Sequence, residues 1–144
     1  MTAANTTQRL VELGLRGMAM AYERQRDQPA IQTQAFDVRL GDLLDFEAAE
    51  RDTRKIGRYL KAAKLRFSQA ALEDVEYRSD RGLDHSQVMA LAEGEWIRRK
   101  QNLILTGATG TGKSWLACAF GNQACRQGFT TYYCTCLLYT SDAA

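Results

Sequence analysis

Residues Asn102–Ser114 read NLILTGATGTGKS, and this stretch predicts the fold of the second half of the chain. From Gly107 it fits the pattern G-x-x-x-x-G-K-[ST], the phosphate-binding loop or Walker A motif, at every fixed position. Glycines let the backbone form a nest of N–H donors that approaches a phosphate chain without a Cβ in the way. The residues expected to bind nucleotide are Gly107, Ala108, Thr109, Gly110, Thr111, Gly112, Lys113, Ser114 and Trp115.

Two side chains of this loop have distinct expected roles. Lys113 is expected to reach the β- and γ-phosphates, and the Ser114 hydroxyl is expected to bind Mg²⁺, which takes few protein ligands. The helix after the loop adds its unpaired N-terminal N–H groups and the positive end of its dipole. The sequence therefore predicts ATP and Mg²⁺ as ligands, against the alternative of a glycine-rich turn that binds nothing.

The segments on both sides of the loop have the context that the motif requires. Leu103–Thr106 is predicted to be a strand, and the residues after the loop form an amphipathic helical pattern that continues to Gln127. Gly128 stands where a helix C-cap glycine belongs, and Phe129–Cys134 (FTTYYC) is predicted to be a second strand. The predicted fold class is α/β, an all-helical N-terminal domain followed by the first strand–loop–helix–strand of a P-loop NTPase with an incomplete sheet.

Composition narrows the class of protein. The chain has 144 residues, 45% hydrophobic and 25% charged, with a net charge of +2, which is ordinary for a soluble globular protein. No apolar run approaches the roughly 20 residues of a membrane span, and the N-terminus lacks the pattern of a signal peptide, so we expect a cytoplasmic protein and no membrane partner. The four cysteines (Cys118, Cys125, Cys134 and Cys136) and the single His85 lack the spacing of a zinc site.

Helices are expected in the first hundred residues. The first is predicted over residues 5–28, capped by Asn5 and stopped by Pro29, with its glycines serving close helix packing. A second is predicted from about Thr33 to well past Phe46, and a third from a cap at Asp84. The predicted domains are 1–83, helical, and 84–135, the start of the ATPase domain, followed by residues 136–144.

A run of positive charge lies in the middle of the chain. Between Arg51 and Arg66 there are seven basic residues and one acid. Helical spacing stacks several of these side chains into adjoining rows, which could lie along a DNA backbone. The residues expected to contact DNA are Arg51, Arg54, Lys55, Arg58 and Lys61. The alternative is an ordinary solvated helix face.

Three stretches resemble a known family, the IstB-like ATP-binding proteins, helper ATPases of bacterial insertion sequences that are related to DnaC-type helicase loaders. They are LGLRGMAMAYE at Leu13–Glu23, EAAERDTRKIGRYLKAAKLR at Glu47–Arg66, and EGEWIRRKQNLILTGATGTGKSWLACAFGNQACRQGFTTYY at Glu93–Tyr133. The resemblance implies an AAA+ ATPase with a small helical N-terminal domain. It further implies binding of ATP and duplex DNA, assembly into homo-oligomers, and presentation of target DNA to the transposase of the same element.

The chain also departs from this pattern. Hydrolysis in the class needs an acidic pair, a sensor residue and an arginine finger, and none of these is recognised in this sequence, so the catalytic residues are unknown. We therefore expect nucleotide binding without useful hydrolysis, from a full-length parent that is an ATPase. Residues 136–144 (CLLYTSDAA) are expected to be a non-native tail, with a genuine strand extension as the alternative.

Three further interpretations stay open at this point. One is a DnaC-like helicase loader, which the motif cannot separate from a transposition helper. Another is a helical DNA-binding module whose nucleotide half is inert. A small-molecule kinase would share the loop but would need an arginine-bearing lid, which the sequence after Ser114 does not offer.

In AAA+ folds the first two strands are not neighbours, so the two predicted strands are also expected to lack pairing partners.

Overall fold

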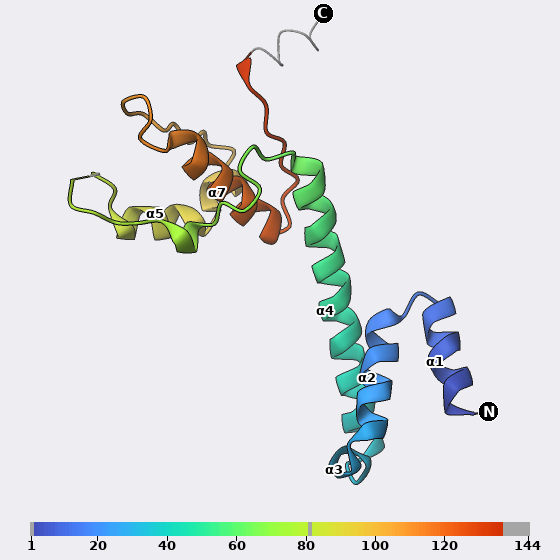
Figure 1. The fold of residues 1–144 in the computed structure, drawn as a ribbon. Coiled ribbons are helices and arrows are strands. Elements are labelled where there is room, and N and C mark those ends of the chain that lie inside the picture. The colour runs from blue at the N-terminus through green and yellow to red at the C-terminus, as the bar shows by residue number, and fades with distance from the viewer. Residues whose placement is uncertain (1, 81, 137–144) are drawn as a thin grey trace, which may run out of the picture. The chain divides into compact units, whose positions relative to one another are not determined.

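The computed structural model describes residues 2–80 and 82–136, with the side chain of Ala3 excepted (Figure 1). The chain divides into two compact units, Met1–Lys55 and Ile56–Ala144. The border falls inside one long helix, α4 (Phe36–Ala63), which contributes its N-terminal part to the first unit and its C-terminal part to the second. The predicted border between functional domains at residues 83 and 84 is a different division and stays a prediction.

The first unit contains α1 (Ala3–Glu12), α2 (Arg16–Asp27), α3 (Pro29–Gln32) and the start of α4. The prediction of one helix over residues 5–28 is wrong, because the chain breaks at Gly14, where φ is +78°. The predicted cap at Asn5 is also wrong, since α1 begins two residues earlier. The predicted stop is confirmed: α2 ends at Asp27, before Pro29.

Gly17 has the packing role that was expected of a glycine in this region. A Cβ at this position would lie 2.5 Å from the main-chain oxygen of Phe46 and 2.7 Å from Cα of Glu47. The backbones of α2 and α4 therefore approach more closely than any side chain at residue 17 would permit. Among the described residues of this unit, the buried hydrophobic side chains are the small ones of Ala19 and Ala21.

The N-terminus of α2 is capped from a distant part of the chain. Its own N-cap residue, Leu15, makes no side-chain hydrogen bond. Instead, Oε2 of Glu47 accepts hydrogen bonds from the main-chain N–H groups of Gly17, at 2.8 Å, and Met18, at 3.2 Å. The carboxylate is 5% exposed and satisfies donors that the first turn of a helix leaves without intrahelical partners. Glu47 thus joins α4 to α2.

The second unit is built around α7 (Lys113–Arg126), with the C-terminal part of α4, the 3₁₀ turn η1 (Leu72–Asp74), α5 (His85–Ala92) and α6 (Glu95–Arg98). Its core cluster brings together buried side chains of η1, α5, α7 and the segment before η1, namely Ala70, Leu72, Val88, Ala92, Leu116, Cys118, Ala119 and Phe120. The predicted cap of α5 is confirmed, because Asp84 accepts a hydrogen bond from the N–H of Ser86. Gly128, the glycine predicted to end the helix after the loop, follows Gln127 at the end of α7 and has a left-handed φ of +89°.

The prediction of two strands is wrong. Neither Leu103–Thr106 nor Phe129–Cys134 forms a strand, and no strand occurs in residues 2–80 and 82–136, so the described part of the chain is helical rather than α/β. The pattern of a strand nevertheless persists in burial: Leu103 and Leu105 are half-buried while Ile104 is 79% exposed. A strand requires a neighbour that completes its ladder of hydrogen bonds, and the described chain supplies none to either segment.

Two further expectations from the sequence concern membrane-spanning segments and the cysteines. In the part of the chain that the structure describes, no helix is both long enough and apolar enough to cross a membrane. Cys118 and Cys125, seven residues apart on α7, are completely buried in the core, whereas Cys134 is exposed. The expected non-native tail lies outside the described residues, apart from Cys136.

Candidate nucleotide site and basic helix

The predicted phosphate-binding loop runs directly into α7. Gly110 and Gly112 have φ values of +80° and +91°, in the left-handed region that glycine adopts without strain. Gly112 is the N-cap of α7 and offers no side-chain hydrogen bond. The first N–H groups of α7, those of Lys113, Ser114 and Trp115, are therefore not occupied by a capping side chain, which is what an anion-binding helix terminus requires.

The loop is closed on itself through Lys113. The Lys113 ammonium donates to the main-chain oxygens of Gly107, at 2.8 Å, and Ala108, at 2.6 Å. The Thr111 hydroxyl donates to the same Ala108 oxygen at 2.8 Å. Carbonyl groups satisfy the ammonium charge only in part, so a phosphate that reaches the loop offers Lys113 a stronger, charge-assisted partner.

A cavity of about 940 Å³ opens over the loop. Seven of the nine sequence-predicted ligand residues line it: Gly107, Ala108, Gly110, Thr111, Gly112, Lys113 and Trp115. Thr109 and Ser114 are exposed and lie outside the lining, although Ser114 is in the first turn of α7. The volume is in the range of small-molecule and cofactor sites.

The wall opposite the loop comes from residues 74–91, which sequence reasoning missed. It supplies apolar side chains (Val75, Leu83, Val88 and Leu91) and polar ones (Asp74, Glu76, Asp80 and Gln87). Val88 and Leu91 have helical spacing and lie on α5, which was predicted, but no pattern in the sequence places α5 or residues 74–83 beside the loop. Trp96 is outside the lining, and its indole N–H donates to the Leu91 oxygen at 2.9 Å.

The cavity is electrostatically polarised. Its loop end carries the main-chain N–H groups and the Lys113 ammonium, and its other wall carries three carboxylates. Electrostatics therefore favours an anionic group at the loop end of the cavity and disfavours one beside the three carboxylates.

The C-terminal half of α7 holds this wall in place. The Gln127 side-chain amide donates to the Ala92 oxygen at 2.7 Å, and that of Gln123 donates to the same oxygen at 3.4 Å. Arg126 forms an ion pair with Glu73 in η1. The hydrogen bond from Arg126 lowers the pKa of Glu73 below its ordinary value. One helix thus begins at the phosphate loop and ends at the contacts that position the opposite wall.

The basic residues of α4 divide into two kinds. Arg51 is held by Glu47, with Nε 2.7 Å from Oε1, and Arg54 lies 3.7 Å from the same carboxylate and 3.6 Å from Glu50. Burial raises the pKa of Glu47, but the hydrogen bonds from Arg51, Met18 and Gly17 outweigh it and leave that pKa lowered. Arg51 and Arg54 thus have structural partners, and part of their charge is neutralised.

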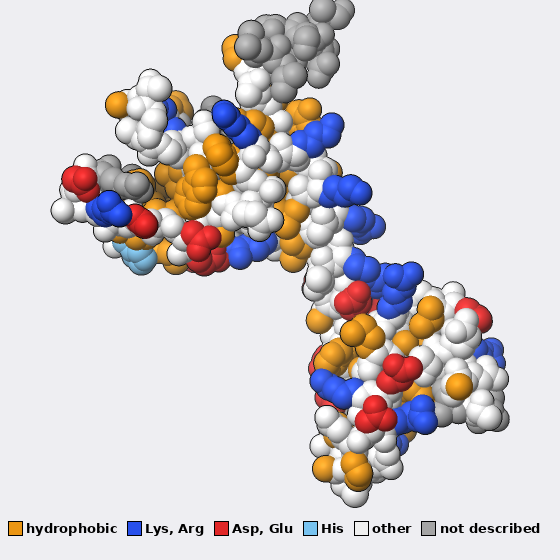
Figure 2. Space-filling model, viewed as in Figure 1, with side chains coloured by type: hydrophobic (Ala, Val, Ile, Leu, Met, Phe, Trp, Pro, Cys, Tyr) orange, Lys and Arg blue, Asp and Glu red, His pale blue; other side chains and the backbone are white. Residues whose placement is uncertain are grey.

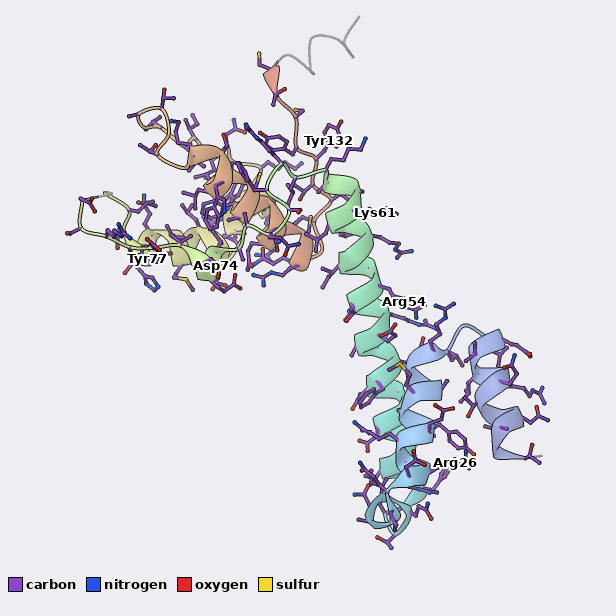
Figure 3. The ribbon with its side chains drawn as sticks, in the orientation of Figure 1. Arg26, Arg54, Lys61, Asp74, Tyr77 and Tyr132 are labelled. Atoms are coloured by element: carbon purple, nitrogen blue, oxygen red, sulfur yellow. The ribbon has the colours of Figure 1, made fainter. Side chains whose placement is uncertain are left out.

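The second kind lies further along α4. Arg58 and Lys61 are exposed, and at a spacing of three residues they are neighbours on the helix surface. The opposite face of this half of the helix is half-buried or buried, and Ala63 is completely covered. Figure 2 shows Lys and Arg side chains gathered along this part of α4, and Figure 3 shows Arg54 and Lys61 on one side of it.

Arg98 and Arg99 serve the local helix rather than a surface row. Both pair with Glu95, at 3.6 Å and 3.0 Å. Arg98 also donates to the Glu93 oxygen at 3.0 Å and lies over the Phe129 ring at 5.6 Å. Both arginines thus have partners within the segment that precedes the loop or beside it.

Comparisons with known proteins identify relatives over most of the chain. The family described as IstB-like ATP binding protein matches residues 8–140. A protein named as an ATP-binding protein of the insertion sequence IS1162, from Pseudomonas fluorescens, is 49% identical over 133 residues, 92% of this chain and 58% of that protein.

Two proteins of Sinorhizobium fredii, also named as insertion-sequence ATP-binding proteins, are similar to this chain. One is 43% identical over 133 residues, covering 92% of this chain and 54% of that protein. The other is 40% identical over 124 residues, covering 86% of this chain and 50% of that protein. The chain therefore spans about half the length of these three relatives. On the match over residues 8–140, the chain belongs to the family of IstB-like ATP-binding proteins of insertion sequences.

Proposed function

We propose that this chain binds ATP together with Mg²⁺ at the loop Gly107–Ser114. The observation that carries the proposal is the cavity of about 940 Å³, one end of which is formed by the glycine loop and the open N-terminus of α7. Family membership supports nucleotide binding as the general activity.

The residues present suit this ligand. The left-handed glycines Gly110 and Gly112 turn main-chain N–H groups into a nest for phosphate oxygens. Lys113 exchanges its two loop carbonyls for the β- and γ-phosphates. The Ser114 hydroxyl, exposed in the first turn of α7, would hold Mg²⁺, whose charge offsets that of the phosphates.

A titration with a fluorescent ATP analogue in the presence of Mg²⁺ tests this proposal. Lys113→Ala is expected to weaken binding by at least about tenfold, because a charge-assisted hydrogen bond is lost. Lys100→Ala is the matched control, since Lys100 is exposed and outside the cavity lining. Equal affinities of the Lys113→Ala variant and the unchanged chain refute the assignment of the loop.

We propose further that the protein acts in transposition of an insertion sequence, in the cytoplasm, with duplex DNA and the transposase of the same element as partners and as a homo-oligomer when full length. The names of the relatives support the link to insertion sequences. The exposed basic face of α4 supports the DNA contact. Hydrolysis is proposed for the longer protein, whose catalytic residues this chain does not identify; binding is the activity proposed for the chain itself.

Four of the five proposed DNA contacts differ in exposure and ion pairing, and so in the effect expected from their loss. Arg58 and Lys61 are exposed, whereas Arg51 and Arg54 share the carboxylate of Glu47. Replacing Arg58 or Lys61 by alanine is expected to reduce the salt slope of duplex binding by about one each, as for loss of one phosphate contact. Arg51→Ala is expected to change the slope less. An unchanged slope in the double variant of Arg58 and Lys61 refutes the proposed DNA face.

A further inference from the structure

An exposed aromatic ring lies beside the C-terminal end of α4. Tyr132 is 61% exposed, although its chain neighbours Thr131 and Tyr133 are half-buried. The N–H of Tyr133 donates to the oxygen of Ala63, the last residue of α4, at 2.8 Å. The main chain is thus hydrogen-bonded to the end of α4 directly after Tyr132, while the Tyr132 ring is exposed.

A lysine accompanies this ring. The ammonium of Lys64 lies 5.9 Å from the centre of the Tyr132 ring, within the range of a cation–π contact. Lys64 follows α4 with φ at +51°, a conformation that glycine usually provides at a helix end. The chain therefore tolerates left-handed strain at a position where a positive charge meets the ring.

The exposed basic face of α4 leads to the same place. Arg58 and Lys61 stand one or two turns before Lys64, and Figure 3 shows Lys61 and Tyr132 at the same end of the helix. Arg66 then lies 5.3 Å from the centre of the partly exposed Phe67 ring. Cations that follow a phosphate backbone, interleaved with exposed aromatic faces, are the combination that binds single-stranded nucleic acid, because unpaired bases stack on the rings.

We propose that Lys61, Lys64 and Tyr132 form a binding site for single-stranded DNA, in which one base stacks on the Tyr132 ring and the two ammonium groups contact the adjoining phosphates. A paired base cannot reach this ring, because both of its faces are covered by its neighbours in the duplex. The site therefore favours unpaired or locally opened DNA. This inference rests on the proposed DNA face of α4 and adds a preference that duplex contact alone would not give.

The test uses the 144-residue chain and three fluorescent probes of about 16 nucleotides, a length suited to one such site. They are oligo-dT, an abasic strand with the same phosphates, and a duplex. Tyr132→Leu is expected to weaken oligo-dT binding about tenfold and leave abasic-strand binding unchanged. Tyr132→Phe retains the ring and should bind as the unchanged chain does. Lys61→Ala should weaken binding to both strands.

Circular dichroism confirms that each variant is folded, and substitution at an exposed position is expected to leave the fold intact. The inference is overturned if Tyr132→Leu has no effect on oligo-dT, if it weakens the abasic strand equally, or if the unchanged chain does not bind oligo-dT. Duplex binding that persists in any of these cases leaves the proposed DNA face standing. If the unchanged chain binds oligo-dT in a Tyr132-dependent way but does not bind the duplex, the duplex proposal is refuted and the single-strand site is supported.

Discussion

Replacement of Glu47 by glutamine tests whether a single carboxylate organises the N-terminal unit. One oxygen of Glu47 accepts from the N–H groups of Gly17 and Met18, and the other faces Arg51, at 2.7 Å, and Arg54, at 3.7 Å. Every one of these four neighbours is a donor. A glutamine has the same shape but carries an NH₂ group on one side, so one pair of donors must face another donor.

The size of the effect follows from these contacts. If the amide oxygen stays on α2, the variant loses the charge at a helix N-terminus, about 0.3–1 kcal/mol, and the pair with Arg51, about 0.3–0.5 kcal/mol because that arginine is mostly exposed. We expect a loss of about 1 kcal/mol in the free energy of unfolding. Glu47→Ala also leaves the two main-chain donors without an acceptor, and the expected loss rises to about 2–3 kcal/mol.

The pH dependence has a definite sign. The pKa of Glu47 is lower in the folded chain than its ordinary value of 4.5. A depressed carboxyl pKa contributes stability that is complete above the unfolded value and is lost as pH falls through the folded value. The difference in stability between the unchanged chain and Glu47→Gln should therefore be constant near neutral pH and shrink below about pH 4.5.

Amide hydrogen exchange measured by NMR reports this unit directly, because the N–H groups of Gly17 and Met18 are the donors concerned. Their protection factors should fall slightly in Glu47→Gln, whose amide oxygen can still accept from them, and strongly in Glu47→Ala, while amides of α7 keep theirs. Glu50→Ala is the matched control, since the Glu50 carboxylate is one turn away on α4 and lies 3.6 Å from Arg54. Equal protection of Gly17 and Met18 in Glu47→Ala and Glu50→Ala refutes the capping role.

Three other predictions concern stability and reactivity. Gly17→Ala should destabilise the chain by about 1–3 kcal/mol, because its Cβ would meet the backbone of α4. Gly57→Ala should stabilise it by about 0.5–1 kcal/mol, because a Cβ there would meet nothing within 4 Å. Urea unfolding measures both variants, and equal effects contradict the packing argument. Lys100→Gly should stabilise the chain by about 0.5 kcal/mol in the same assay, because the φ of Lys100 is +56°. Arg99→Gly is the control and should destabilise the chain, because the φ of Arg99 is −81°. A loss of stability in Lys100→Gly contradicts the strain at that position. A thiol reagent should modify Cys134 and Cys136 rapidly in the native chain, and Cys118 and Cys125 only after unfolding; simultaneous reaction of all four contradicts their burial.

The elements that could be predicted are those whose causes are local. The start of α5 follows from the carboxylate of Asp84, and the end of α7 from the left-handed Gly128. Long α4 follows from its amphipathic spacing. Gly14 shows the limit of such reasoning, because a glycine within a helical pattern predicts close packing and a chain break equally well. Gly17 packs and Gly14 breaks, and only the positive φ distinguishes them.

The strands failed for a related reason. Their alternating burial is a local property, and it survives at Leu103, Ile104 and Leu105. Their pairing is not local, because a ladder needs a second strand that lies elsewhere in the chain. Sequence reasoning therefore recognised segments with the local pattern of a strand but could not supply the hydrogen bonds that define one.

The candidate site shows the same division between local and distant causes. The loop could be predicted because its glycines, Lys113 and the helix after it form one continuous segment. The opposite wall could not, because it is held by single contacts across the fold, from Gln127 to the Ala92 oxygen and from Arg126 to Glu73. Both anchors are at the C-terminal end of α7, and the phosphate loop is at its N-terminal end. The two surfaces that line the cavity are thus fixed to opposite ends of one helix, and on the proposed nucleotide site the rigidity of α7 would set the distance between phosphate and base.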